Sequence, residues 1–293
     1  MQWRLLAPFI APKFRFPNKV AVTVIGHNAI IRQASFPLSE IVVENLPSVD
    51  AAQEVFLAIK RGMLIASINL SCGIRIADEV AILDAVTPLP GQDERPFICP
   101  QDRSLARLVM KSGPVEFQMS YALPKLIHGL ESGARSTSAA LALSDQRLAL
   151  ACMLYTDSFF ETSPEAQFIT LIGVLEVLKE QDPVSQEAEQ LIDGWLNEIR
   201  QLEPGEAQSL RGRLRSLKHV SIGTGIRRLI YRHLGPERAR EVQALYAIRS
   251  KLVHEGERPP RLNDDLRQSR YIVRELLAKI LSDSERRIGQ KDM

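Results

Sequence analysis

Two residues late in the chain have side chains that together could bind a phosphate and move a proton. Arg249 and His254 are separated by four residues within the stretch 244–256. Arginine is a permanent cation whose planar guanidinium matches phosphate oxygens, and histidine titrates near neutral pH. RNA cleavage by general acid–base chemistry needs both functions. The alternative is a structural helix end, in which Arg249 pairs with a carboxylate such as Glu176 and His254 caps a carbonyl.

The spacing of this pair does not identify a site by itself. Arg228 and His233 have the same separation, and an arginine-rich chain with five histidines produces such pairs by chance. The surrounding pattern carries more information, because four apolar residues recur at helical spacing and predict one buried stripe with Arg249 at its border. These four are Val242, Leu245, Ile248 and Leu252. Gly256 is expected to end this helix, so that His254 falls in its last turn.

Helical periodicity continues through the whole second half of the chain. Ser163 and Pro164 form a helix start, with serine as the cap and proline at the first helical position. The predicted helices cover residues 141–160, 163–178, 186–202, 224–234, 236–255 and 263–281. These segments predict an all-α bundle of about 150 residues, and the boundary before it falls near the small-residue stretch 133–138.

The first half of the chain has a mixed pattern. Strands are predicted at 20–25 and 29–34, with Gly26-His27-Asn28 as the turn, and a third strand is predicted at 115–121. Ser48 or Asp50 is expected to cap a helix over 51–60 that extends toward Leu70. The proline-rich stretch 88–100 is predicted to be a loop. We therefore expect an α+β fold, with a mixed domain over residues 1–135 and the helical bundle over 136–293.

Composition indicates a soluble, globular, cytoplasmic protein. Apolar residues make up 45% of the 293 residues, charged residues make up 25%, and the net charge is +2. Cys72, Cys99 and Cys152 lie far apart and form no CxxC pair, which favours a reducing compartment and argues against a structural zinc site. The apolar run after Arg4 is too short for a signal peptide, and 63–74 is too short to span a bilayer. We expect no metal and no cofactor.

Charge is segregated within the predicted bundle. Between residues 165 and 203 there are nine acidic and two basic residues, a net charge of about −7. Between residues 206 and 240 there are nine basic and two acidic residues, a net charge of about +7. The basic residues are Arg211, Arg213, Arg215, Lys218, Arg227, Arg228, Arg232, Arg238 and Arg240. They predict either an RNA surface, with Tyr231 available for stacking, or a helix face that pairs with the acidic segment.

The segment 245–256, Leu-Tyr-Ala-Ile-Arg-Ser-Lys-Leu-Val-His-Glu-Gly, resembles the signature of HEPN domains, an Arg-x4-6-His motif in a helical bundle. The Apea-like HEPN subgroup is the most similar. The segments 163–176 and 214–223 support the resemblance, which covers roughly residues 140–283 and leaves the first 135 residues unassigned.

The resemblance implies a metal-independent endoribonuclease of the kind found in toxins and anti-phage defence proteins. By that analogy, two bundles pair as a homodimer, His254 transfers protons and Arg249 holds the scissile phosphate. Members of the family often have Asn or Asp after the arginine, where this chain has Ser250. Glu176 stands where similar sequences carry a helix acid that could orient the arginine.

The resemblance leaves a second class of function open. Some HEPN domains bind RNA or nucleotides, or only dimerise, and do not cleave. The role of residues 1–135 is expected to be sensing a trigger or restraining the activity.

Overall fold

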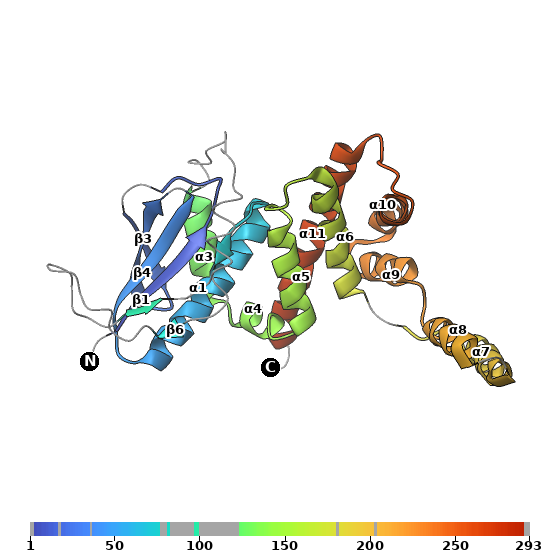
Figure 1. Cartoon of the computed structure of the whole chain (residues 1–293). Helices are drawn as coiled ribbons and strands as arrows, with labels where there is room; N and C mark the ends of the chain where they lie inside the picture. The colour runs from blue at the N-terminus through green and yellow to red at the C-terminus, as the bar shows by residue number, and fades with distance from the viewer. Residues whose placement is uncertain are drawn as a thin grey trace. The chain divides into compact units, whose positions relative to one another are not determined.

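The computed structural model of the protein describes residues 3–16, 19–35, 37–76, 81–82, 97–99, 123–179, 182–201 and 204–289. The backbone contacts divide the chain into two compact units, each described below by itself. The first unit contains Met1–Val174 and Leu262–Met293, and the second contains Leu175–Arg261. The first unit joins a sheet to helices (Figure 1), which confirms the α+β class.

The described residues form seven strands of one mainly antiparallel sheet. Its order is β2-β3-β4-β1-β7-β6, and β5 pairs with β1 outside this path. The strands are β1 (Trp3–Ile10), β2 (Val20–Val24), β3 (His27–Ser35), β4 (Leu38–Leu46), β5 (Arg75–Ile76), β6 (Ala81–Ile82) and β7 (Phe97–Cys99). Only the β1–β7 pair is parallel among these strands.

The predicted hairpin is present, with its turn one residue earlier than expected. Val24 pairs with His27, so the turn consists of Ile25 and Gly26. Both residues have a positive φ, 42° and 87°, as a type I′ turn requires, and glycine adopts this conformation without steric cost. The predicted strand at 115–121 lies outside the described residues. The predicted loop at 88–100 is wrong at 97–99, which form β7.

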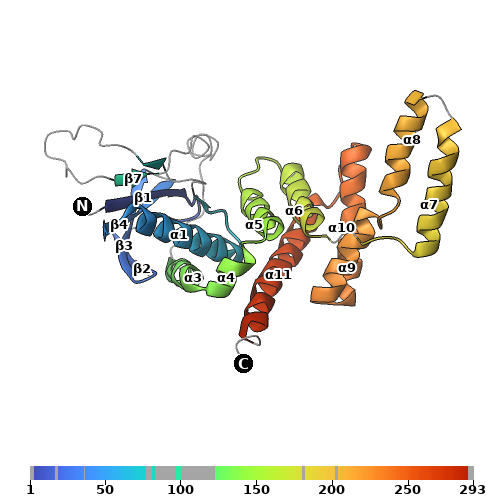
Figure 2. The ribbon, with the colours of Figure 1, turned by 90° about the horizontal axis from the view of Figure 1, so that it is seen from below.

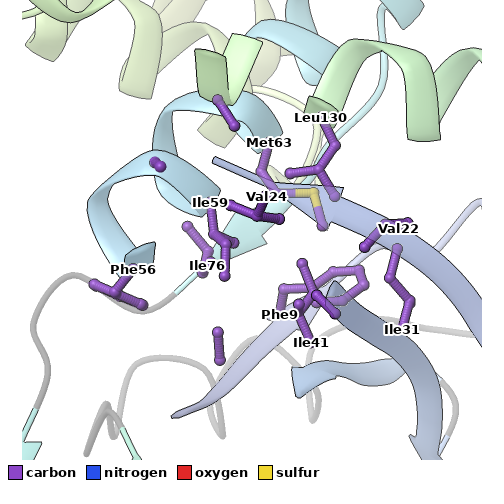
Figure 3. Packing of buried hydrophobic residues seen from close by; sticks show 14 of the residues in the cluster. Phe9, Val22, Val24, Ile31, Ile41, Phe56, Ile59, Met63, Ile76 and Leu130 are labelled. Carbon is purple, nitrogen blue, oxygen red and sulfur yellow. The ribbon is translucent and has the colours of Figure 1, made fainter. Parts of the chain in front are cut away.

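One long helix covers the sheet, as Figures 1 and 2 show. Helix α1 runs over Val49–Leu70, and the Ser48 hydroxyl caps it by accepting a hydrogen bond from Ala51 N at 3.1 Å. This confirms the predicted cap and the extension to Leu70. Side chains of the sheet and of α1 meet in a hydrophobic core (Figure 3), where Phe9, Ile41 and Ile59 are among the fully buried residues.

Helix α3 (Leu123–Arg135), which the sequence did not predict, packs against α1. Small residues line this contact. A Cβ at Gly62 would lie 2.3 Å from the carbonyl oxygen of Leu130, and one at Gly129 would lie 3.0 Å from Ala66 Cβ. The Arg61 side chain donates to the carbonyl of Gly133 at 3.0 Å and so satisfies a group at the end of α3. The helices therefore approach more closely than larger residues would allow.

The predicted helix over 141–160 is wrong as a single element. The structure has α4 (Thr137–Ala142) and α5 (Gln146–Asp157). Asp145 separates them because its carboxylate accepts hydrogen bonds from Arg147 N at 2.8 Å and Leu148 N at 3.3 Å. An aspartate in this position starts a new helix and does not continue the old one.

The remaining helices agree with the sequence except for α7 and α8. Ser163 caps the next helix by accepting from Ala166 N at 3.1 Å, and Gly235 ends α9 as expected. Helix α8 was not predicted, and the predicted helix 186–202 ends as an α-helix at Glu198. The bounds are α6 (Pro164–Leu178), α7 (Gln186–Glu198), the 3-10 turn η2 (Ile199–Gln201), α8 (Pro204–Ser216), α9 (Ile222–Leu234), α10 (Pro236–His254) and α11 (Leu262–Gly289).

The predicted division of the chain at residue 135 stays a prediction. The contacts place α4, α5 and α11 in the same unit as the sheet, so that 136–174 and 262–293 belong to the first unit and 175–261 stands as the second. None of the described helices is both long and apolar enough to cross a membrane.

Cys72 and Cys152 are free thiols buried in the first unit. Burial raises the pKa of each thiol from 9.0 to about 12. In the unfolded chain both groups ionise near pH 9, so their contribution to stability is intact below that pH. We expect the free energy of unfolding to fall as the pH rises from about 9 toward 12. Urea unfolding of the wild type and of Cys152→Ala over this range tests this, because the variant should lose stability less steeply. Equal slopes would contradict it.

Candidate functional site

Helix α10 carries the candidate pair, and its first half is anchored in the second unit. Val242 and Leu245 are buried, as the predicted stripe requires. Ile248 and Leu252 are only half-buried, so the predicted buried stripe is wrong for its second half. The end of α10 that carries Arg249 and His254 is therefore more accessible than its start.

Arg249 forms an ion pair with Glu176, a residue of α6. The Arg249 Nη2 lies 3.2 Å from Glu176 Oε1 and 3.4 Å from Oε2. The two side chains are 19% and 23% exposed, so solvent weakens their ion pair only in part. Arg249 Nε is buried, and no acceptor within the described ranges bonds to it. The carboxylate thus holds the guanidinium in place and leaves most of its five N–H donors unused.

Tyr246 belongs to the same group of side chains, and the sequence did not single it out. It precedes Arg249 by three residues, a spacing that makes side chains neighbours on a helix. Its ring packs over the first turn of α9, where a Cβ at Gly223 would lie 3.1 Å from Tyr246 Cδ1. Burial raises the pKa of Tyr246, the negative charge of Glu176 raises it further, and Arg249 opposes this. The phenol therefore remains a hydrogen-bond donor at neutral pH.

His254 is the last residue of α10 and is exposed. Glu255 follows it as the C-cap, and Gly256 has a φ of 71°, so the helix ends where the glycine predicted. His254 lies about 7.5 Å further along the axis than Arg249 and about 140° around it. In the described part of the chain no side chain bonds to the imidazole. Ser250, half-buried, lies between the two residues on the helix.

The predicted RNA-binding residues lie in two groups, one at α8 and the other on α9. Arg211, Arg213 and Arg215 lie on α8, and Lys218 lies just after it. Arg227, Arg228, Tyr231 and Arg232 lie on α9. The α9 residues are all exposed and, together with Thr224, line one open hollow of about 660 Å³. Tyr231 is 62% exposed, so its ring is available for stacking.

Some of the basic residues pair with the acidic segment. Lys218 Nζ lies 2.7 Å from Asp193 Oδ1 and 3.3 Å from Glu189 Oε1. Arg228 Nη1 lies 2.8 Å from Asp182 Oδ2. Charge segregation in the sequence therefore reflects in part the ion pairs within this unit. The α9 hollow nevertheless keeps Arg227 and Arg232 exposed beside Tyr231.

Comparison with known proteins adds no family to this description. A scan against models of protein families, a search of curated proteins and a search of solved structures each found no match. Among the described residues, no three His, Cys, Asp or Glu side chains form a group that could hold a metal ion. The resemblance to HEPN domains thus rests on the residues named above.

Proposed function

We propose that the chain is a metal-independent endoribonuclease of the HEPN type. The observation that carries the proposal is the Arg249–Glu176 pair on accessible helix ends, with His254 exposed one and a half turns further along α10. A fixed guanidinium with unused donors is suited to a phosphate group, and an exposed imidazole is suited to proton transfer.

The residues take separate roles in the reaction. His254 accepts the proton of a 2′-hydroxyl, and the resulting oxygen attacks the adjacent phosphorus. The bond from phosphorus to the 5′ oxygen breaks, and a proton returned by imidazolium completes the 5′-hydroxyl. The other product carries a 2′,3′-cyclic phosphate. Arg249 stabilises the negative charge on the phosphate oxygens, Glu176 positions Arg249, and Ser250 offers a hydroxyl to the same phosphate.

The hollow on α9 is the proposed binding surface for the RNA. Arg227, Arg228 and Arg232 neutralise phosphates, and Tyr231 stacks on a base. Arg211, Arg213, Arg215 and Lys218 of the α8 region extend the positive surface. The proposal includes a homodimer in the cytoplasm and a regulatory role for residues 1–135 in a defence or toxin system.

The test is cleavage of a mixed RNA in EDTA by the full chain. We expect the wild type to cut and His254→Ala to be slower by at least about a hundredfold. His128→Ala, which removes an exposed histidine of α3, is the matched control and should cut like the wild type. The cut fragments should accept a labelled 5′ phosphate from a kinase without prior dephosphorylation. Equal cleavage by wild type and His254→Ala would overturn the assignment.

One observation favours a second candidate, a non-catalytic RNA-binding or dimerisation module. Glu176 already forms an ion pair with Arg249, and His254 has no bonded partner among the described residues. Both observations also fit a structural ion pair at a helix end. RNA binding without cleavage, in EDTA and with added Mg²⁺, would support this candidate.

A further inference from the structure

Positively charged side chains of the first unit gather near one aromatic ring, that of Phe159, which follows the end of α5. The Cζ of Arg270, on α11, lies 4.6 Å from the centre of this ring, and the Nζ of Lys13, in the loop after β1, lies 5.7 Å from it. Arg274 is one turn further along α11, on the same face as Arg270. Helix α11 packs against both α5 and α1 (Figure 2). All four side chains are half-buried.

The phenol of Tyr155, a residue of α5, links this group to the end of α1. Its ring meets the Phe159 ring edge-on, with 5.4 Å between the two ring centres. Its hydroxyl donates to Ser71 Oγ at 3.2 Å, so that the hydroxyl hydrogen of Ser71 can be donated to another acceptor. Burial raises the pKa of this phenol, and the positive charges of Arg270 and Arg274 are among the effects that oppose the rise. Both arginines therefore act on one point beside Ser71.

The three cations have no opposite charge beside them in the part of the chain that the structure describes. Arg270 Nη2 donates to the amide oxygen of Gln167 at 2.9 Å, which is a neutral acceptor. Arg270 Nε is buried and bonds to no acceptor among the described residues. Burial lowers the pKa of Arg270, and Tyr155, not a carboxylate, opposes this. Lys13 and Arg274 contact aromatic rings and form no ion pair within the described ranges.

This group of side chains is electrostatically incomplete. Burial removes water from a guanidinium, and a buried charge is costly unless an opposite charge or enough hydrogen bonds replace the water. Charged residues in protein interiors are accordingly paired in almost all cases. Lys13 and Arg274 add positive charge around Arg270 and increase this cost. An anion among the three side chains would supply the missing charge and the missing acceptor.

The number and type of the donors indicate which anion fits. A guanidinium presents a planar fork that matches two oxygens of a phosphate, and the ammonium of lysine adds a point charge. Three positive charges favour an anion with two negative charges over a carboxylate with one. The serine hydroxyl supplies one more donor. A phosphate group therefore suits this place better than a carboxylate.

We propose that Lys13, Arg270 and Arg274 bind the phosphate group of a small ligand, which is either the free ion or a nucleotide. Ser71 donates its hydroxyl hydrogen to the same group. These residues come from the loop after β1, the end of α1 and α11, so the ligand joins segments that are far apart in the sequence and stabilises the first unit. The site uses no residue of the Arg249–Glu176 pair. Phosphate binding and RNA cleavage can therefore each fail without the other.

Isothermal titration calorimetry of the full chain with inorganic phosphate tests the proposal. We expect the wild type to bind with a dissociation constant of about 0.1–1 mM, which a few charge-assisted hydrogen bonds can support. Arg270→Gln removes the central guanidinium and should raise this constant at least about tenfold. Arg267→Gln is the matched control, because Arg267 lies on the same helix with its side chain 77% exposed, and the constant should stay within about twofold. No binding by the wild type at about 20 mM phosphate, or equal losses in both variants, would overturn the proposal.

The arginines of the α9 hollow also attract phosphate, and Arg227→Gln separates the two places. This variant removes a cation from the hollow and should keep the affinity that Arg270→Gln loses. Phosphate binding that is lost in Arg227→Gln and retained in Arg270→Gln would place the ligand on α9 and contradict the proposal.

Two further variants keep the test decisive if Arg270→Gln unfolds. Lys13→Gln and Arg274→Gln change residues of different elements, and each should weaken phosphate binding severalfold. Without phosphate, each variant should melt at the same temperature as the wild type or higher, because it removes a positive charge from a group that lacks an opposite charge. With phosphate, the wild type should gain more in melting temperature than either variant. Wild-type affinity in both variants would sink the proposal.

AMP distinguishes the two sources of the phosphate group. Binding of AMP that is tighter than that of phosphate, and that Arg270→Gln weakens, would identify a nucleotide as the ligand, whereas equal or weaker binding would identify the free ion. Adenosine lacks the phosphate and should bind at least about tenfold more weakly than AMP. Adenosine that binds as tightly as a tightly bound AMP would show that the base is recognised and the phosphate is not, which is incompatible with this site.

Discussion

Replacing Arg249 by alanine is expected to lower the rate of RNA cleavage by about a hundred to a thousandfold. The guanidinium supplies the positive charge of the Arg249–Glu176 pair. Negative charge develops on the phosphate oxygens in the transition state, and the guanidinium stabilises it. Arg249→Lys retains the charge but loses the planar fork, so we expect an intermediate rate. The measurement is kcat/KM on a short RNA with one cleavage site.

The controls for this prediction separate chemistry from folding. Arg261→Ala removes an exposed arginine that lies outside the basic set and should leave cleavage within about twofold of the wild type, since surface changes rarely have large effects. Glu176→Gln keeps the shape of the side chain but removes the charge that holds Arg249, so a partial loss is expected. If Arg249→Ala cleaves as fast as Arg261→Ala, the site lies elsewhere.

Replacing Gly62 by alanine is expected to lower the free energy of unfolding by about 3 kcal/mol. The new Cβ would lie 2.3 Å from the carbonyl oxygen of Leu130 and 2.9 Å from its Cδ1. The Leu130 rotamer could change, but the backbone oxygen cannot move unless α1 and α3 separate. Separation would open the core that Figure 3 shows around Met63 and Leu130. Urea unfolding followed by circular dichroism measures the change.

Gly173→Ala is the matched control for Gly62→Ala. Gly173 lies inside α6, and a Cβ there would meet no atom within 4 Å. Alanine is favoured over glycine in a helix by up to about 1 kcal/mol, so this variant should be as stable as the wild type or more stable. Equal effects of the two substitutions would show that the α1–α3 contact has more space than the structure indicates.

The fold could be predicted where one local signal coincided with a long periodic pattern. Ser48 before α1 and Ser163-Pro164 before α6 each marked a helix start, and both serines cap as expected. Strand β1 was not predicted, and Pro8 weakens its signal because proline is rare inside a strand. The sheet accommodates Pro8 because it lies between the short partners β7 and β5, which pair with the two ends of β1.

Helix α8 was not predicted because its apolar residues follow a weak periodic pattern. In α8 the arginines and two glycines obscure the apolar positions, and only Ala207 is buried. The interruption at Asp145 was missed because the apolar periodicity continues on both sides of it. Helix caps depend on one side chain and two backbone groups, so composition over a window cannot reveal them.

Part of the candidate site could also be predicted from the sequence. The stop at Gly256 placed His254 in the last turn, and the charge of Glu176 suggested a partner for Arg249; the structure has both features. The place of Tyr246 could not be predicted, because it depends on the approach of α10 to Gly223 in α9. Its spacing of three residues from Arg249 was the one available signal.

The bridge between Pro183 and His219 determines how this part of the chain can change in evolution. The polypeptide enters and leaves the α7–α8 hairpin at two adjacent points, tied by hydrogen bonds at 182–184 and 218–220. A segment with adjacent ends can be gained, lost or lengthened in one genetic step without rethreading the remaining chain. The hairpin is therefore a unit of insertion that can be acquired or lost separately from the Arg249 site.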